Sequence, residues 1–89
     1  MESRKYIGMD VHQASISAAV RDDAGKLVME CVIETKSFTI LQFIQGLRGS
    51  LWVTFEEGTS ATWLYDLVKP HVAQVVVSDP EERATEGRQ

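Results

Sequence analysis

The sequence predicts an α/β fold built on a mixed five-stranded sheet. Apolar residues alternate with polar ones over the first third of the chain, whereas later segments repeat them at helical spacing. The resulting order of elements is β-β-β-α-β-α-β. Short turns make the first three strands antiparallel, and helical crossovers make the first, fourth and fifth strands parallel. These connections predict the strand order 3-2-1-4-5, with the helices packed on the sheet.

The first three predicted strands form an antiparallel meander. Residues 5–11 are mostly apolar, which is typical of a buried strand. In the second strand, apolar residues occupy every even position over 16–20. A turn over residues 22–26 follows, in which Gly25 can adopt a positive φ. In the third strand, residues 27–35, one face is apolar and consists of Leu27, Met29, Cys31 and Ile33.

The second half of the sequence alternates helices with strands. Residues 37–47 carry apolar side chains at helical spacing, and Ser37 is the predicted N-cap. Residues 51–56 form the fourth predicted strand. The second predicted helix covers residues 61–68 and is stopped by Pro70, because proline cannot continue the backbone hydrogen bonding of a helix.

The fifth predicted strand completes a single domain. It is centred on Val75-Val76-Val77 and closed by Asp79-Pro80. We expect one domain over residues 1–80. The tail over residues 81–89 contains only one apolar residue, Ala84, so we expect it to be polar and mobile.

Composition excludes several classes of protein. The 89 residues are 44% hydrophobic and 25% charged, which excludes a disordered or collagen-like chain. The longest apolar run is three residues, far below the roughly 18 that a membrane span needs, so no membrane partner is expected. The net charge of −4 gives no sign of the basic patch that a free-standing nucleic-acid binder usually carries. The single Cys31 cannot form an internal disulfide, which fits a core position in a cytoplasmic protein.

Two acidic residues are candidate metal ligands. Asp10 lies near the end of the first strand and Glu56 ends the fourth, and these strands are neighbours in the predicted sheet. Carboxylates at this edge can share a divalent cation for phosphoryl transfer. The alternative explanation is that Asp10 and Glu56 are ordinary acidic residues, exposed to solvent at the ends of their strands. Glu57 is a competing ligand, although its side chain should point to the other face.

Three further polar residues are candidate contacts to nucleic acid. His12 follows Asp10 by two positions, so it can share the face of Asp10 in an extended segment. Thr59 and Ser60 precede the second helix, whose first N–H groups can hold a phosphate. A surface turn explains His12 equally well, and ordinary helix capping explains Thr59 and Ser60.

Four short strings of the sequence resemble one known family. In chain order they are Tyr6-Ile7-Gly8-Met9-Asp10-Val11-His12, Ala24-Gly25-Lys26, Val53-Thr54-Phe55-Glu56-Glu57-Gly58-Thr59 and Trp63-Leu64-Tyr65-Asp66-Leu67. Together they resemble the N-terminal domain of IS110-type insertion-sequence transposases, in order and in register over nearly the whole predicted domain. The first string is the most specific of the four.

The resemblance implies a function for the two carboxylates. In that family the domain is a RuvC-like, ribonuclease-H-like fold with a DEDD carboxylate set, and Asp10 and Glu56 match its first Asp and its Glu. They would bind Mg²⁺ or Mn²⁺ for the cleavage and transfer of DNA strands. Members of this family, which move bacterial insertion sequences, also carry a C-terminal domain with a nucleophilic serine. They act on DNA as oligomers and use a structured RNA to guide recognition.

The sequence departs from the family pattern after the fifth strand. The family's third and fourth carboxylates are expected there, but residues 81–89 contain no Asp pair, and Asp79 matches a strand end rather than a catalytic position. The serine-bearing domain is also missing. We therefore expect an incomplete transposase domain that holds part of the metal site.

Two other functions stay open. The N-terminal lobe of an actin or sugar-kinase ATPase begins with the same order of elements and also suits the Ile7-Gly8-Met9-Asp10 string. However, ATP phosphates need small residues after that Asp, and here Val11, His12 and Gln13 follow. The second alternative is a non-catalytic dimerisation remnant, which the net charge and the apolar group around Trp63 and Tyr65 favour.

We predict that the isolated chain neither cleaves nor joins DNA detectably, because it carries only two of the four carboxylates in the family pattern. The assay is incubation of the pure 89-residue protein with duplex DNA and Mg²⁺. Robust cleavage that Asp10→Ala abolishes would contradict this prediction.

We also predict self-association, because no helix follows the fifth predicted strand to cover its outer surface. Sedimentation velocity at increasing protein concentration measures this directly. A clean monomer at high concentration would count against it.

Overall fold

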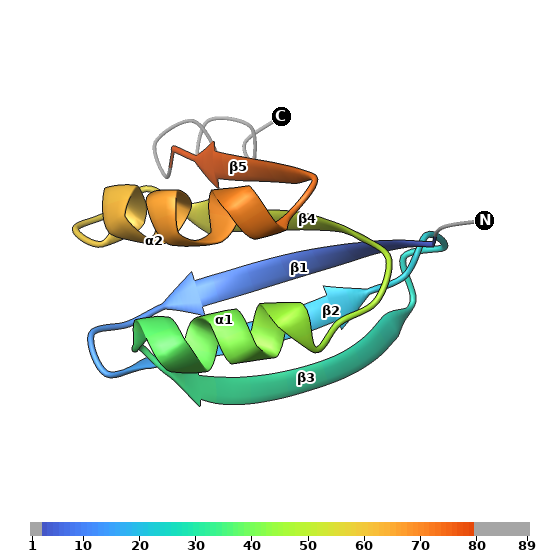
Figure 1. Ribbon diagram of the computed structural model, residues 1–89, viewed down its shortest axis with the longest axis horizontal. Helices are drawn as coiled ribbons and strands as arrows, with labels where there is room; N and C mark the ends of the chain where they lie inside the picture. Colours follow the sequence, from blue (N-terminus) through green and yellow to red (C-terminus); the bar gives the residue numbers. More distant parts are fainter. Residues whose placement is uncertain (1–2, 80–89) are drawn as a thin grey trace, which may run out of the picture.

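The computed structural model describes residues 3–79 and confirms the predicted fold class and strand order. Five strands form one mixed sheet in the order β3-β2-β1-β4-β5 (Figure 1). Strand β1 lies at the centre, antiparallel to β2 and parallel to β4. The strands are β1 (Arg4–Val11), β2 (Ser15–Arg21), β3 (Leu27–Glu34), β4 (Ser50–Glu56) and β5 (Gln74–Ser78). The predicted tail over residues 81–89 lies outside the described residues.

Both helices cover the same face of the sheet (Figure 1). They are α1 (Ser37–Gln45) and α2 (Ala61–Val68), and the 3-10 turn η1 (Lys69–His71) continues α2. Pro70 lies within η1, in agreement with the predicted end of the helix. Within residues 3–79, no helix is long and apolar enough to cross a membrane.

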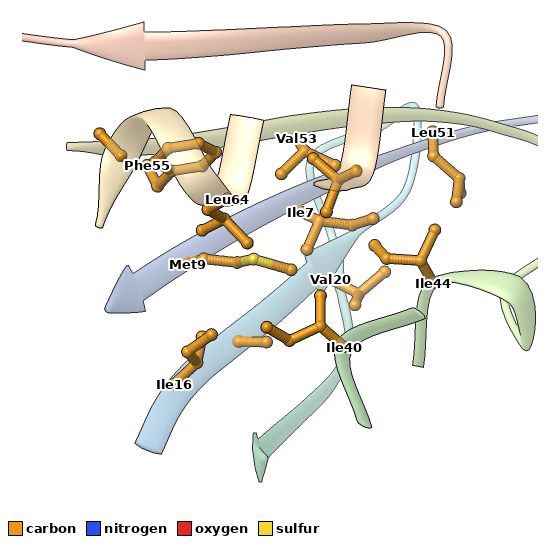
Figure 2. Packing of buried hydrophobic residues seen from close by; sticks show 13 residues of the cluster. Ile7, Met9, Ile16, Val20, Ile40, Ile44, Leu51, Val53, Phe55 and Leu64 are labelled. Carbon is orange, nitrogen blue, oxygen red and sulfur yellow. The ribbon is translucent and has the colours of Figure 1, made fainter. Parts of the chain in front are cut away.

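The hydrophobic core lies between the sheet and these two helices (Figure 2). Side chains alternate between the two faces of a strand, so the core takes odd positions from β1 and β4 and even positions from β2. Each fully buried aliphatic side chain contributes about 1.5–3 kcal/mol to folding. The fully buried members include Ile7, Ile16, Val20, Ile40, Ile44, Val53, Leu64 and Val68.

Helix capping differs from the sequence prediction. Ser37 is the first residue of α1 rather than its N-cap, and Lys36 occupies the N-cap position. Ser60 stands at the N-cap position of α2, but its side chain makes no capping hydrogen bond. Both helices are therefore held by the packing of their apolar faces rather than by side-chain caps.

The third strand is more exposed than its alternation predicts. Cys31 and Ile33 pack against the core as expected, whereas Leu27 and Met29 are exposed. The pairing of β2 with β3 shifts register between Val20 and Arg21, and β3 is an edge strand. The start of β3 therefore leaves the area that the helices cover.

The predicted turn between β2 and β3 is confirmed in detail. The Asp22 Oδ1 atom accepts hydrogen bonds from the backbone N–H groups of Ala24 at 2.9 Å and Lys26 at 3.0 Å. Gly25 has a φ of 82°. A glycine suits this position because other residues rarely adopt the left-handed conformation.

A close approach of backbones fixes the start of β4. Gly49 has a φ of 95°, and the Ser50 N–H donates to the Ser3 carbonyl at 2.9 Å. A Cβ atom at Gly49 would collide with that same carbonyl.

We predict that Gly49→Ala lowers the free energy of unfolding by about 1–3 kcal/mol, because it adds both backbone strain and a collision. Urea denaturation followed by circular dichroism measures the change. Gly8→Ala is the matched control, since a Cβ at Gly8 meets no atom within 4 Å. Equal stability of the Gly49 variant and wild type would contradict the prediction.

Candidate functional site

Asp10 and Glu56 lie at the same edge of the sheet, on neighbouring strands. The parallel pairing of β1 with β4 aligns Gly8 with Thr54 and Met9 with Phe55, so Asp10 and Glu56 come next in register. Met9 and Phe55 are buried under the helices. Since side chains alternate along a strand, both carboxylates point to the opposite face. The predicted juxtaposition of the two strand ends therefore agrees with the observed register.

Hydroxyl groups flank the two carboxylates along the same row of the sheet. Asp10 pairs with Ser17 across the β1–β2 ladder, and Glu56 pairs with Ser78 across the β4–β5 ladder. The Ser78 hydroxyl donates to the Phe55 carbonyl at 3.4 Å. Neither serine is among the site residues predicted from the sequence. Their positions follow from strand register, which the alternation of residue types alone does not fix.

His12 contacts Asp10 directly. Its Nε2 atom lies 3.2 Å from Asp10 Oδ2, and the two side chains are 60% and 76% exposed. The His12 backbone is held by two hydrogen bonds, one donated to the Ser15 carbonyl and one accepted from the Thr35 hydroxyl, each at 2.9 Å. An exposed pair of this kind contributes little to stability.

The loop after β4 brings the other candidate residues to the same edge. The Glu57 N–H donates to the Ser78 carbonyl at 2.7 Å, which extends the β4–β5 ladder by one step. The Gly58 carbonyl then accepts from the Ala61 N–H at 3.1 Å as α2 begins. A broad depression of about 1570 Å³ is lined by all five predicted site residues, namely Asp10, His12, Glu56, Thr59 and Ser60, and also by Glu57.

The donor set fits a hydrated magnesium ion. Mg²⁺ in proteins is commonly held by one or two carboxylates, keeps several waters and binds substrate phosphates as well. Asp10 and Glu56 supply two such carboxylates at one edge of the sheet. Within the part of the chain that the structure describes, no group of three or more His, Cys, Asp or Glu residues gathers in metal-binding geometry. Asp10 and Glu56 are thus two carboxylates on neighbouring strand ends, and metal binding by them stays a prediction.

Comparison with known proteins adds no family assignment. No protein-family model and no curated protein matches this chain.

Proposed function

We propose that this chain is an incomplete N-terminal catalytic domain of a DEDD DNA transposase of the IS110 type. Its role would be in the Mg²⁺-dependent cleavage and transfer of DNA strands during transposition. The observation that carries the proposal is the register of β1 and β4, which makes Asp10 and Glu56 neighbours on one face. The strand order and the Ile7–His12 string support it further.

Each candidate residue has a defined part in this proposal. Asp10 and Glu56 would hold the ion, which supplies charge stabilisation for the in-line displacement at a phosphate. His12, whose Nε2 atom lies 3.2 Å from Asp10 Oδ2, would help to orient that carboxylate toward the ion. Thr59 and Ser60, at the start of α2, would contact the DNA phosphate near the first N–H groups of that helix.

The proposal includes the partners of the complete protein. DNA is the substrate, the active form is a homo-oligomer in the cytoplasm, and a structured RNA guides recognition through the full-length protein. A chain with a net charge of −4 lacks the strongly basic character that usually holds DNA, so the proposal assigns the phosphate contacts to the ion and to other parts of the complete protein.

We predict that Mn²⁺ broadens amide resonances around residues 9–12 and 55–58 in ¹⁵N-labelled protein. Removing one of two carboxylate ligands should weaken binding at least about tenfold, as measured by the Mn²⁺ concentration at half-broadening, in Asp10→Ala and in Glu56→Ala. Glu57→Ala is the matched control and should bind Mn²⁺ like wild type.

Two results would contradict the metal assignment. One is the absence of localised broadening in wild type. The other is the reverse pattern, in which Glu57→Ala abolishes broadening and Glu56→Ala does not. Binding of ATP with Mg²⁺ at this edge would instead favour the ATPase alternative.

A further inference from the structure

The fold separates basic from acidic residues that are mixed along the sequence. The net charge of −4 is an average over two ends of the sheet with opposite character. Most of the basic residues that the structure describes lie where β1 and β4 begin and β2 ends (Figure 1). We call this the basic end, and it comprises Arg4, Lys5, Arg21, Lys26 and Arg48. The opposite end, about 20 Å away along β1 at roughly 3.3 Å per residue, carries Asp10, Glu34, Glu56 and Glu57.

Contacts between segments far apart in the sequence assemble the basic end. The Lys5 Nζ atom donates to the Arg48 carbonyl at 3.2 Å. The turn between β2 and β3 also lies here, since the Arg4 N–H donates to Asp23 Oδ2 at 3.4 Å. Asp22, the other acidic residue of this turn, already accepts backbone N–H groups through its Oδ1 atom. Five basic side chains therefore outnumber two carboxylates, and the ion pairs within residues 3–79 lie at the opposite end.

A row of four side chains crosses the basic end on the sheet face opposite the helices. Strand register places Tyr6 of β1 between Arg21 of β2 and Trp52 of β4. Gln74 of β5 lies beside Trp52 and completes the row. The neighbours of Tyr6 and Trp52 along β1 and β4 are buried under the helices, so alternation turns both rings to the other face. Tyr6 is 38% exposed, and Arg21 and Gln74 are exposed as well. We refer to these four residues as the cross-strand row.

Arg4 adds a second guanidinium beside the cross-strand row. It lies 5.2 Å from the centre of the Trp52 ring, and the Tyr6 and Trp52 rings are 6.2 Å apart and inclined by 44°. The neighbouring Tyr6 side chain also raises the pKa of Arg4 above its ordinary value, chiefly through hydrogen bonding. Two guanidinium groups, two aromatic rings and one amide therefore meet within the width of four neighbouring strands.

We propose that the cross-strand row binds a single-stranded nucleic acid, with the phosphates on the basic end and bases stacked on the exposed aromatic surface. Unpaired bases stack on Tyr and Trp side chains, while Arg and Lys side chains neutralise the backbone. Arg and Gln side chains also form hydrogen bonds with exposed base edges. A duplex stacks its bases on one another, so it cannot use the two rings in this way.

The division of charge favours a nucleic acid that runs across the strands of the sheet. A path along β1 would bring phosphates to Asp10 and the other carboxylates, which repel them when no cation is bound. A polyanion without bases, such as an acidic peptide, would match the charge but leave the Tyr6 and Trp52 rings unused. The inference goes beyond the proposed function, because it assigns this chain a nucleic-acid contact that needs no metal ion and lies away from the candidate metal site.

The first experiment titrates the 89-residue protein with a thymidine oligonucleotide at low salt in EDTA. The chain contains two Trp residues, so Trp63→Phe leaves Trp52 as the fluorescent reporter. The oligonucleotide should quench Trp52 fluorescence, and its affinity should fall as salt is raised, because binding releases counterions from the phosphates. A DNA duplex of the same length and poly-glutamate should each bind at least about tenfold more weakly, since neither offers unpaired bases.

The second experiment compares substitutions in the Trp63→Phe background. Lys26→Glu at the basic end should weaken oligonucleotide binding at least about fivefold, because it replaces a phosphate contact with a repulsive charge. Lys36→Glu is the matched control, since it changes the net charge equally but lies next to Glu34 at the opposite end. It should leave the dissociation constant unchanged. Tyr6→Leu keeps an apolar side chain but removes the ring, and it should weaken binding at least about fivefold through the loss of stacking.

Three outcomes would overturn the proposal. The first is unchanged Trp52 fluorescence at every oligonucleotide concentration. The second is equal weakening by Lys26→Glu and Lys36→Glu, which would reduce the binding to an effect of net charge. The third is equal or tighter binding of the duplex or of poly-glutamate, which would show that the rings take no part. Because every measurement is made in EDTA, none of these outcomes bears on Mn²⁺ binding by Asp10 and Glu56.

Discussion

The parallel pairing of β1 with β4 is the constraint on which the rest of this structure depends. It aligns Met9 with Phe55 under the helices and so fixes the next two residues, Asp10 and Glu56, on the opposite side. A slip of one residue in either strand would turn its carboxylate toward the apolar core, which is energetically costly for a charge. The hydrophobic core therefore determines on which face Asp10 and Glu56 lie, although the core is on the other side of the sheet.

The crossovers through α1 and α2 give the two faces of the sheet different properties. Because both helices pack on one side, the described core is concentrated between that side and the helices. The other side carries the acidic pair at one end, the small residues Gly8 and Ser17 in a low centre, and Arg4 and Arg21 at the far end. The candidate metal site thus lies on the face opposite both helices.

The sequence is sufficient to predict the order of elements, because alternation over residues 16–20 and helical spacing over residues 37–47 are strong signals. It also predicts Asp10 and Glu56 at adjacent strand ends. It does not predict the positions of Ser17 and Ser78, because strand register depends on the packing of the whole sheet. The prediction of Ser37 as an N-cap is wrong for a related reason. Residue preference indicates where a helix can start, but packing selects the first turn.

The register shift at the start of β3 affects how the sheet can grow. An exposed edge strand ordinarily offers free backbone groups to another strand, which leads to open-ended fibres. Here the edge strand β3 is irregular where it pairs with Arg21, and it carries Glu30 and Glu34. The other edge strand, β5, is only five residues long. Both features disfavour strand addition at the edges. Association through a face ends when that face is covered, so such an assembly is finite rather than fibrous.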